Sequence, residues 1–267
     1  FNFQQFIEGN MTKSSNVTIV TGGASGIGEE IVRLCVQRGQ KVGIIDLNAE
    51  AGEILSDELG SNVTFEEADV CNENQLSEAC KSTQNKLGDI AGLVTCAGIS
   101  PVRFPIEECS LEEFRRLFDN HASGTFLTCK IVGSQMVTSG GGAIVTISSA
   151  TAIRPAPMLG YAAGKAAVLN LSQSLAVHWG NKNVRINTLV PGWVDTPFIR
   201  RQEAAGRDLS PITKITPMRR MVEPREVAEV ALFLLSPAAS AMTGSAVVVD
   251  CGITLAGGWL PYGKLPD

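Results

Sequence analysis

A tyrosine and a lysine lie four residues apart in a stretch that reads as the start of a helix. They are Tyr161 and Lys165, and residues at positions i and i+4 share one helix face. A phenol titrates near pH 10 and needs roughly 4 kcal/mol of phenolate stabilisation to act as a base near neutral pH. One cation about 4 Å away supplies on the order of that energy. We therefore predict that Lys165 lowers the pKa of Tyr161 and lets the phenol exchange protons with an alcohol or a ketone.

Two serines, Ser148 and Ser149, follow an apolar run that ends shortly before this pair. A hydroxyl at the end of a strand can donate a hydrogen bond to a substrate oxygen and polarise a carbonyl, as an oxyanion donor does. A tyrosine–lysine pair alone is most often a surface contact. Its meaning therefore depends on what the neighbouring segments bind.

A glycine-rich turn indicates what those segments bind. Gly22, Gly26 and Gly28 fall between the predicted strand Val17–Thr21 and the predicted helix Gly28–Arg38. Glycines there allow a tight turn and a close approach of the backbone to a pyrophosphate, which then faces free amides and the positive helix end. Such a turn alone can be structural, but its place between a strand and an amphipathic helix predicts a dinucleotide site.

The residue that ends the second predicted strand indicates which dinucleotide binds. This residue is Asp46, 18 positions past Gly28. A carboxylate there can accept both hydroxyls of the adenosine ribose of NAD, and it repels the 2′-phosphate of NADP. The next residue, Leu47, offers no positive charge to hold that phosphate. The sequence therefore predicts NAD as cofactor, and an oxidised nicotinamide would add a second positive charge beside Tyr161.

Apolar runs rich in β-branched residues alternate with helical patterns along the chain. The predicted strands are Val17–Thr21, Lys41–Asp46, Val63–Glu66, Ile90–Cys96, Ala143–Ile147, Val184–Leu189 and Ala246–Val249. The predicted helices are Gly28–Arg38, Ala49–Leu59, Glu73–Lys86, Glu112–Thr138, Tyr161–Trp179 and Glu226–Leu235. This order predicts an α/β fold with a doubly wound, Rossmann-like parallel sheet of seven strands and helices on both faces.

We predict a single domain over residues 11–267. Residues 1–10 lack the alternating pattern and are interpreted as vector-derived sequence or a flexible arm. The segment 197–224 carries five arginines and scattered prolines. Because it follows the end of a strand, we predict that it is a lid on the substrate side. The tail 255–267 is apolar enough to close the substrate pocket or to contact a neighbouring subunit.

Composition argues against several other classes of function. The 267 residues carry a net charge of −5 and show no basic face, so nucleic acid is not expected as a partner. No apolar run approaches the length of a membrane span, and no signal peptide is visible. Seven cysteines without a CxxC pair indicate free thiols in a reducing compartment, the cytoplasm. The two histidines argue against a metal centre.

Together these segments resemble the short-chain dehydrogenase/reductase family, in its subgroup of single domains of about 250 residues. The resemblance extends from Asn16 to Gly252. Its motifs are Thr21–Gly28, Asp69–Val70, Ala97–Gly98, Ile147–Ser149, Tyr161–Lys165, Pro191–Pro197 and Val249–Gly252. The resemblance implies an NAD-dependent oxidoreductase that acts on a secondary alcohol or ketone, such as a polyol, sugar or hydroxy acid. It also implies a homodimer or homotetramer formed through the two long central helices.

The resemblance implies roles for individual residues as well. Tyr161 resembles the acid–base group, and Lys165 resembles its electrostatic partner, which also binds the nicotinamide ribose. For the active serine, the strand motif selects Ser149, which we prefer, whereas the commonest spacing before the tyrosine selects Ser148. The implied cofactor contacts, besides the tyrosine and the lysine, are Gly22, Ser25, Gly26, Ile27, Gly28, Asp46, Leu47, Asp69, Val70, Cys96, Ala97, Gly98, Pro191, Gly192, Val194 and Thr196.

Two positions depart from the family pattern. Cys96 stands where an asparagine usually follows the fourth strand, and His121 replaces an asparagine that helps to hold a water beside the lysine. His121 either joins catalysis by relaying the proton through its ring or only packs in the cleft of a weaker catalyst. These changes are the sole argument for the alternative function, a non-catalytic NAD-binding or regulatory protein on the same fold.

Overall fold

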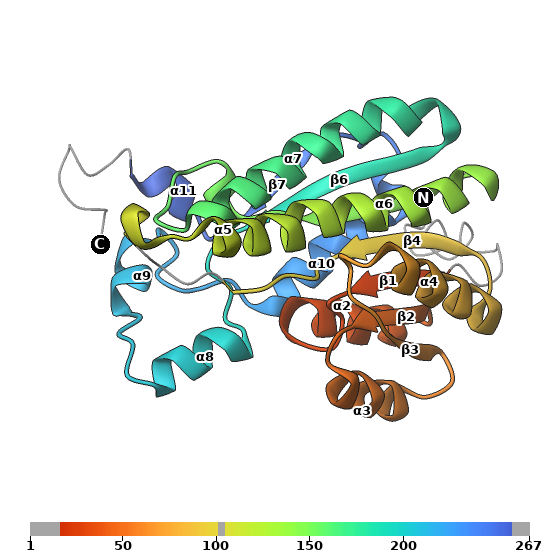
Figure 1. The fold of residues 1–267 in the computed structure, drawn as a ribbon, viewed down its shortest axis with the longest axis horizontal. Coiled ribbons are helices and arrows are strands. Elements are labelled where there is room, and N and C mark those ends of the chain that lie inside the picture. Colours follow the sequence, from red (N-terminus) through yellow and green to blue (C-terminus); the bar gives the residue numbers. More distant parts are fainter. Residues whose placement is uncertain (1–16, 101–104, 258–267) are drawn as a thin grey trace, which may run out of the picture.

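The computed structural model describes residues 17–100 and 105–257, so the predicted arm at 1–10 and most of the tail lie outside the described residues. Strands and helices alternate along this part of the chain (Figure 1). The strands are β1 (Val17–Thr21), β2 (Lys41–Asp46), β3 (Val63–Glu67), β4 (Ile90–Thr95), β5 (Gly142–Ile147), β6 (Val184–Pro191) and β7 (Ala246–Val249). The α-helices are α2 (Gly26–Gln37), α3 (Ala49–Leu59), α4 (Glu73–Leu87), α5 (Leu111–Phe118), α6 (Gly124–Thr138), α7 (Leu159–Trp179), α8 (Pro197–Ala204), α9 (Ser210–Ile215), α10 (Pro224–Leu235) and α11 (Ile253–Ala256).

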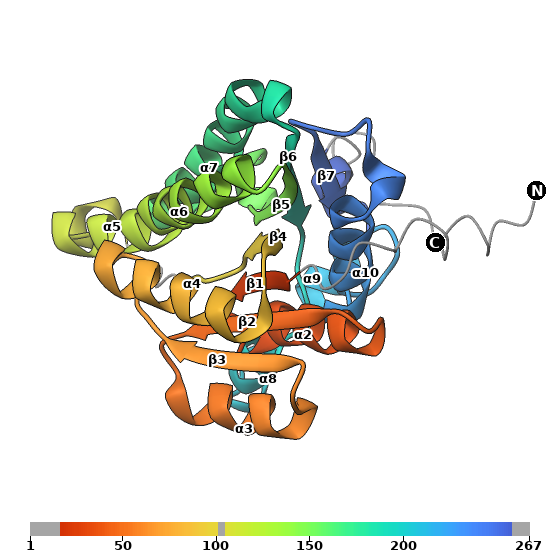
Figure 2. The same ribbon diagram turned by 90° about the vertical axis from the view of Figure 1, so that its right-hand side faces the viewer.

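The strands form one parallel sheet in the order β3-β2-β1-β4-β5-β6-β7. Helices α2, α3 and α10 cover one face of the sheet, and α4, α6 and α7 cover the other (Figure 2). The predicted doubly wound, Rossmann-like fold is thereby confirmed.

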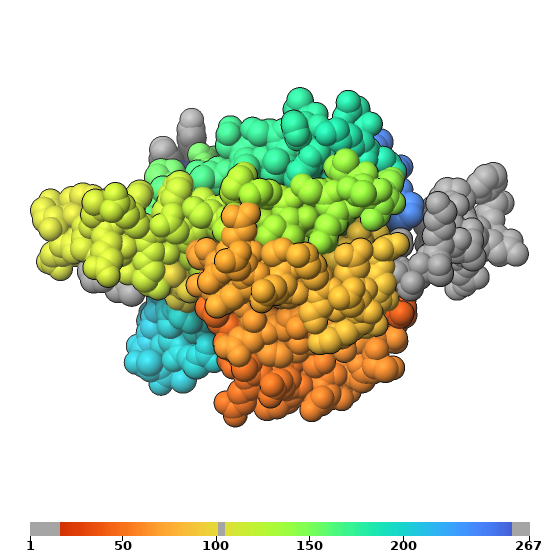
Figure 3. Space-filling model, turned by 45° about the vertical axis from the view of Figure 1, so that its right-hand side comes forward, coloured from red at the N-terminus to blue at the C-terminus, as the bar shows by residue number. Residues whose placement is uncertain are grey.

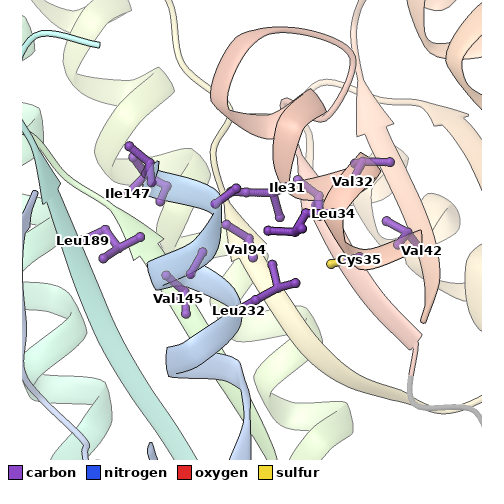
Figure 4. Close-up of a cluster of buried hydrophobic side chains, with 14 of the residues drawn as sticks. Ile31, Val32, Leu34, Cys35, Val42, Val94, Val145, Ile147, Leu189 and Leu232 are labelled. Carbon is purple, nitrogen blue, oxygen red and sulfur yellow. The ribbon is translucent and has the colours of Figure 1, made fainter. Parts of the chain in front are cut away.

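Two apolar layers hold the helices to the sheet. Neighbouring strand residues point to opposite faces, so Val145 belongs to the layer under α2 and α10, whereas Ile144 belongs to the layer under α4, α6 and α7. Figure 4 shows the first layer, where Ile31 of α2 and Leu232 of α10 lie beside Val94 and Val145. Burial of both strand faces explains the continuous apolar runs in the sequence.

The order of the strands reverses between β1 and β4. The chain passes from β1 outward to β2 and β3 and then returns to β4 on the other side of β1. Thr21 at the end of β1 lies opposite Thr95 at the end of β4. In such sheets ligands bind outside the carboxyl ends of the strands at this reversal, so the loops after Thr21 and Thr95 define where a cofactor is expected.

The predicted helix Glu112–Thr138 is interrupted. The structure has α5, a π-helical turn at Asp119–Ser123 and then α6. Apolar spacing misses this turn, because a π turn inserts one residue without breaking the helical pattern and often marks a functional site. The turn buries His121, which is 2% exposed.

The predicted lid at 197–224 is more ordered than its irregular sequence indicates. It contains α8 and α9, and Ile199, Leu209 and Ile212 pack into a small apolar cluster. This cluster is separate from the two layers that cover the sheet. The lid therefore has a packed centre of its own, although it lies outside the sheet.

Candidate active site

The glycine-rich turn after β1 brings backbone very close to backbone. Gly22 and Gly26 have positive φ angles of 68° and 57°, which glycine adopts without strain. A Cβ at Gly28 would lie 2.0 Å from the carbonyl oxygen of Gly22. A Cβ at Gly22 would lie 2.6 Å from the backbone of Ala97, in the loop after β4. The turn therefore fits the cradle that a pyrophosphate needs at a helix start.

A crevice of about 680 Å³ opens at this turn. It is lined by eleven of the predicted cofactor contacts, namely Gly22, Ser25, Gly26, Ile27, Asp46, Leu47, Val70, Cys96, Ala97, Gly98 and Thr196. It is also lined by residues that the sequence analysis did not assign to the cofactor, including Asn48, Ile99, Asn120, Phe198 and Arg201. The spacing of Phe198 and Arg201, three apart at the start of a helix, is the signal that could have placed both on one face.

Other predicted contacts do not line this crevice. The Asp69 carboxylate accepts the amide of Cys71 in its own loop. Val194 is buried in the layer under α10 and forms a bridge with Val222. Gly192 packs against Asp250, where a Cβ would lie 2.8 Å away. Gly28, Tyr161, Lys165 and Pro191 are also absent from the lining.

Asp46 is held in place by two backbone amides. Its Oδ2 accepts from the amide of Ala24 at 3.0 Å, and its Oδ1 accepts from the amide of Asn48 at 3.0 Å. A carboxylate offers about four acceptor positions, so two amides leave acceptor capacity for ribose hydroxyls. The carboxylate therefore stands fixed in the crevice, where it can distinguish a hydroxyl from a phosphate.

Helix α7 carries the tyrosine and the lysine to the same region. Lys165 is buried, and its Nζ donates to the carbonyl oxygen of Ile147 at 2.8 Å, at the end of β5. The same Nζ lies 5.8 Å from the centroid of the Tyr161 ring. Burial lowers the pKa of Lys165 to about 8. The structure thus brings the predicted pair together, with one of the three ammonium hydrogens used by the sheet.

The pKa of Tyr161 departs from the sequence-based prediction. Burial raises this pKa, while a hydrogen bond with Ser149 lowers it. The prediction of a net lowering by Lys165 is wrong for the chain by itself, because it left out the cost of removing a phenolate from water. Burial thus favours the protonated phenol.

The two candidate serines have different partners. Ser148 is buried, and its Oγ donates to the carbonyl oxygen of Lys165 at 2.7 Å. Ser149 faces Tyr161, and its Oγ also accepts the amide of Thr151 at 3.2 Å. Ser149 therefore faces the Tyr161 phenol, whereas Ser148 links β5 to α7.

His121 lies against the same tyrosine. Its ring meets the Tyr161 ring edge-on, with 4.8 Å between centroids and 87° between planes. Its Nε2 is 3.0 Å from the carbonyl oxygen of Ile99, so this nitrogen carries the hydrogen in the neutral ring. Nδ1 is buried and has no hydrogen-bond partner in the described part of the chain. Burial, aided by the charge of Lys165, lowers the pKa of His121 to about 2, which keeps the ring neutral.

This environment predicts that His121 makes folding stability depend on pH. Below about pH 6.5 the unfolded chain binds a proton at this histidine, whereas the folded chain stays neutral until about pH 2. The contribution of the neutral His121 to the free energy of unfolding is therefore fully present above about pH 6.5. It is lost as the pH falls, by about 2 kcal/mol at pH 5. We expect His121→Asn to gain about 2 kcal/mol relative to wild type between pH 7.5 and pH 5 in urea unfolding. His178→Asn changes the other, exposed histidine as the matched control, and an equal gain there would contradict this assignment.

The chain is similar to known oxidoreductases in both sequence and structure. The profile of the enoyl-(acyl carrier protein) reductase family matches residues 22–254. A 2,5-dichloro-2,5-cyclohexadiene-1,4-diol dehydrogenase of Sphingobium indicum is 37% identical over 244 residues, which cover 90% of this chain and 98% of that protein. A D-threitol dehydrogenase of Mycolicibacterium smegmatis is 35% identical over an alignment that covers 90% of this chain and 93% of that protein. The structure of a short-chain type dehydrogenase/reductase from Mycobacterium ulcerans has a TM-score of 0.85 and 34% identity, with 90% of both chains covered.

The chain belongs to the short-chain dehydrogenase/reductase family. It is an oxidoreductase that acts on CH–OH groups with a nicotinamide cofactor. Within the described residues, no helix combines the length and the apolar character that a bilayer span requires.

Proposed function

We propose that this enzyme transfers a hydride between NAD and a secondary alcohol that carries further hydroxyl groups, such as a cyclic diol or a short polyol. The observation that carries the proposal is the meeting of Ser149, Tyr161 and Lys165 beside a crevice that holds a fixed Asp46. The diol and tetritol dehydrogenases among its relatives support this substrate class.

In this proposal one side chain transfers the proton and two others assist it. A bound nicotinamide supplies the hydride acceptor or donor and, when oxidised, a second positive charge beside the phenol. Tyr161 takes the hydroxyl proton of an alcohol, or returns a proton to the oxygen of a ketone. Lys165 stabilises the phenolate and binds the nicotinamide ribose. Ser149 donates a hydrogen bond to the substrate oxygen while charge develops there.

We propose that His121 positions the tyrosine. A ring that stays neutral to about pH 2 cannot store a proton at working pH, which disfavours relay through a protonated imidazole. Its contacts with Tyr161 and with the Ile99 carbonyl instead favour a packing role that fixes the angle of the phenol.

Cofactor choice and the remaining assignments follow the same reasoning. We propose NAD over NADP because the Asp46 carboxylate lies in the crevice and Leu47 beside it has no charge. We propose that all the residues predicted for the cofactor serve it, those behind the crevice through backbone and packing, and that residues 197–224 close over the substrate. A homodimer or homotetramer is supported by apolar side chains exposed on the central helices, Phe126 of α6 and Val177 of α7. A cytoplasmic location is supported by seven free cysteines.

The direct test is turnover. Purified enzyme is incubated with NAD⁺ and a panel of cyclic diols, tetritols and simple secondary alcohols, and NADH is followed by its absorbance. The proposal expects NADH formation with the diols or polyols and a lower kcat/KM with NADP⁺. Binding of NADH without turnover of any secondary alcohol would favour the non-catalytic alternative, and activity only with simple alcohols would refute the substrate class.

The two serines provide a matched pair of variants. We expect Ser149→Ala to lower kcat by about 100-fold, because the substrate oxygen loses its hydrogen-bond donor. We expect Ser148→Ala to keep kcat within the same order of magnitude and to lose about 1 kcal/mol of stability, because it removes one buried hydrogen bond. Steady-state kinetics and urea unfolding of both variants check this. A larger loss of kcat in Ser148→Ala would reverse the assignment.

A further inference from the structure

Helix α8 presents different side chains to two different cavities. Phe198 and Arg201 line the crevice that also contains the glycine-rich turn. Arg200 and Glu203 line a second cavity of about 520 Å³, where Arg200 pairs with Asp195 and Glu203. Ile199 is buried in the small apolar cluster of the lid. This cluster anchors the helix, so the orientation of Arg201 toward the crevice is set by packing.

Arg201 is the one cation among the described residues that line the crevice. Its side chain is exposed, and within the described residues it forms no ion pair. The charged cavity next to it differs, because Arg200 and Arg220 there are paired with carboxylates. The other charged side chain that lines the crevice is the Asp46 carboxylate, whose oxygens are held by backbone amides. The Arg201 guanidinium can therefore bind an anion, and its planar donors suit phosphate oxygens.

The position of α8 points to one part of the cofactor. Thr196, which precedes the helix, lies where a Cβ at Gly26 would contact it at 3.6 Å. The start of α8 therefore stands opposite the start of α2, whose amides face the pyrophosphate in the proposed binding mode. Figure 3 shows the lid, coloured cyan, against the part of the chain coloured red to orange that carries this turn.

We propose that Arg201 binds the cofactor pyrophosphate from the lid side, opposite the glycine-rich turn. This inference rests on the proposed function, because it requires the dinucleotide in this crevice. The amides of α2 contact one side of the pyrophosphate and the guanidinium contacts the other.

The test compares Arg201→Met with Lys214→Met. Lys214 lies in α9 of the same lid, is exposed and does not line the crevice, so both variants lose one lid charge. NADH binding is measured by fluorescence, and ADP-ribose and adenosine are used as competitors that contain and lack the pyrophosphate. We expect Arg201→Met to weaken the binding of NADH and of ADP-ribose by about tenfold, which corresponds to the loss of one charge-assisted contact. The binding of adenosine should weaken by less than about twofold. Arg201→Lys should recover part of the loss. The affinity of wild type for NADH should fall more steeply with salt than that of Arg201→Met.

Several outcomes would overturn the inference. Equal NADH affinity in Arg201→Met and Lys214→Met would show that the guanidinium does not reach the cofactor. An equal loss of affinity for adenosine would indicate that Arg201 contacts the nucleoside. A loss of affinity confined to NADPH would indicate that it contacts a 2′-phosphate. If wild type bound no NADH, the proposed function would fail and this inference with it. Normal wild-type binding with an unaffected Arg201→Met refutes this inference alone.

Discussion

Tyr161→Phe is expected to lower kcat/KM for the best alcohol by about 10³-fold or more, while NADH affinity stays within about twofold of wild type. The substitution removes one oxygen from a ring that is packed against His121 and lies 5.8 Å from the Lys165 ammonium. It leaves the glycine-rich turn and Asp46 untouched. General acid–base catalysis contributes on the order of 10² to 10⁴ in rate, so loss of the proposed acid–base group should eliminate most turnover.

The measurement combines steady-state kinetics with NADH fluorescence titration on the same preparation. Unchanged NADH binding is the internal control for folding. A variant that kept more than about a tenth of the wild-type kcat/KM would mean that another group moves the proton. The proposed roles of Ser149 and Lys165 would then have to be reassigned as well.

Asp46→Asn is expected to shift cofactor preference from NAD⁺ toward NADP⁺ by about 100-fold in the ratio of kcat/KM values. A carboxylate and a phosphate repel by roughly 1 kcal/mol per charge pair at 4 Å even in water, and a 2′-phosphate carries close to two charges. Removing the charge also weakens the hydrogen bonds to the ribose of NAD. The amide keeps an acceptor for only one of the two backbone amides that Asp46 binds, those of Ala24 and Asn48. We therefore expect the variant to fold with a loss of about 1 to 3 kcal/mol of stability.

Glu53→Gln is the matched control for this prediction. Glu53 is an exposed residue of α3 and lies one helical turn after Ala49, which lines the crevice. Its substitution changes the net charge by the same amount. We expect its preference ratio to stay close to that of wild type, because Glu53 is exposed and does not line the crevice, so that water weakens the effect of its charge. A similar shift in both variants, or none in Asp46→Asn, would contradict the role given to Asp46.

The sequence predicted the sheet well because strands that are buried on both faces consist mostly of apolar residues, and these runs are visible in the sequence. Every predicted strand is present within one or two residues, and each is preceded by a polar residue or a glycine. The glycine-rich turn was equally predictable, since a close approach such as that of Gly28 to the Gly22 carbonyl permits no other residue. These features depend on local constraints that a single sequence records.

Features that depend on three-dimensional surroundings were harder to predict. The π turn that buries His121 packs against α7, and apolar spacing does not encode this contact. The raised pKa of Tyr161 follows from burial by segments distant in sequence. Arg201 was grouped with the other lid arginines, because sequence alone does not tell which of two adjacent arginines faces a crevice and which faces a carboxylate.

The reversal of strand order between β1 and β4 separates two groups of candidate site residues along the chain. The glycine-rich turn and Asp46 lie before β4, whereas Ser149, Tyr161, Lys165 and the lid lie after it. The proposed acid–base groups thus lie in one half of the chain, whereas the crevice beside them draws its walls from both halves, because Thr196 and Arg201 line it together with Gly22 and Asp46. Substitutions in residues 197–224 are therefore expected to affect the nucleotide as well as the alcohol.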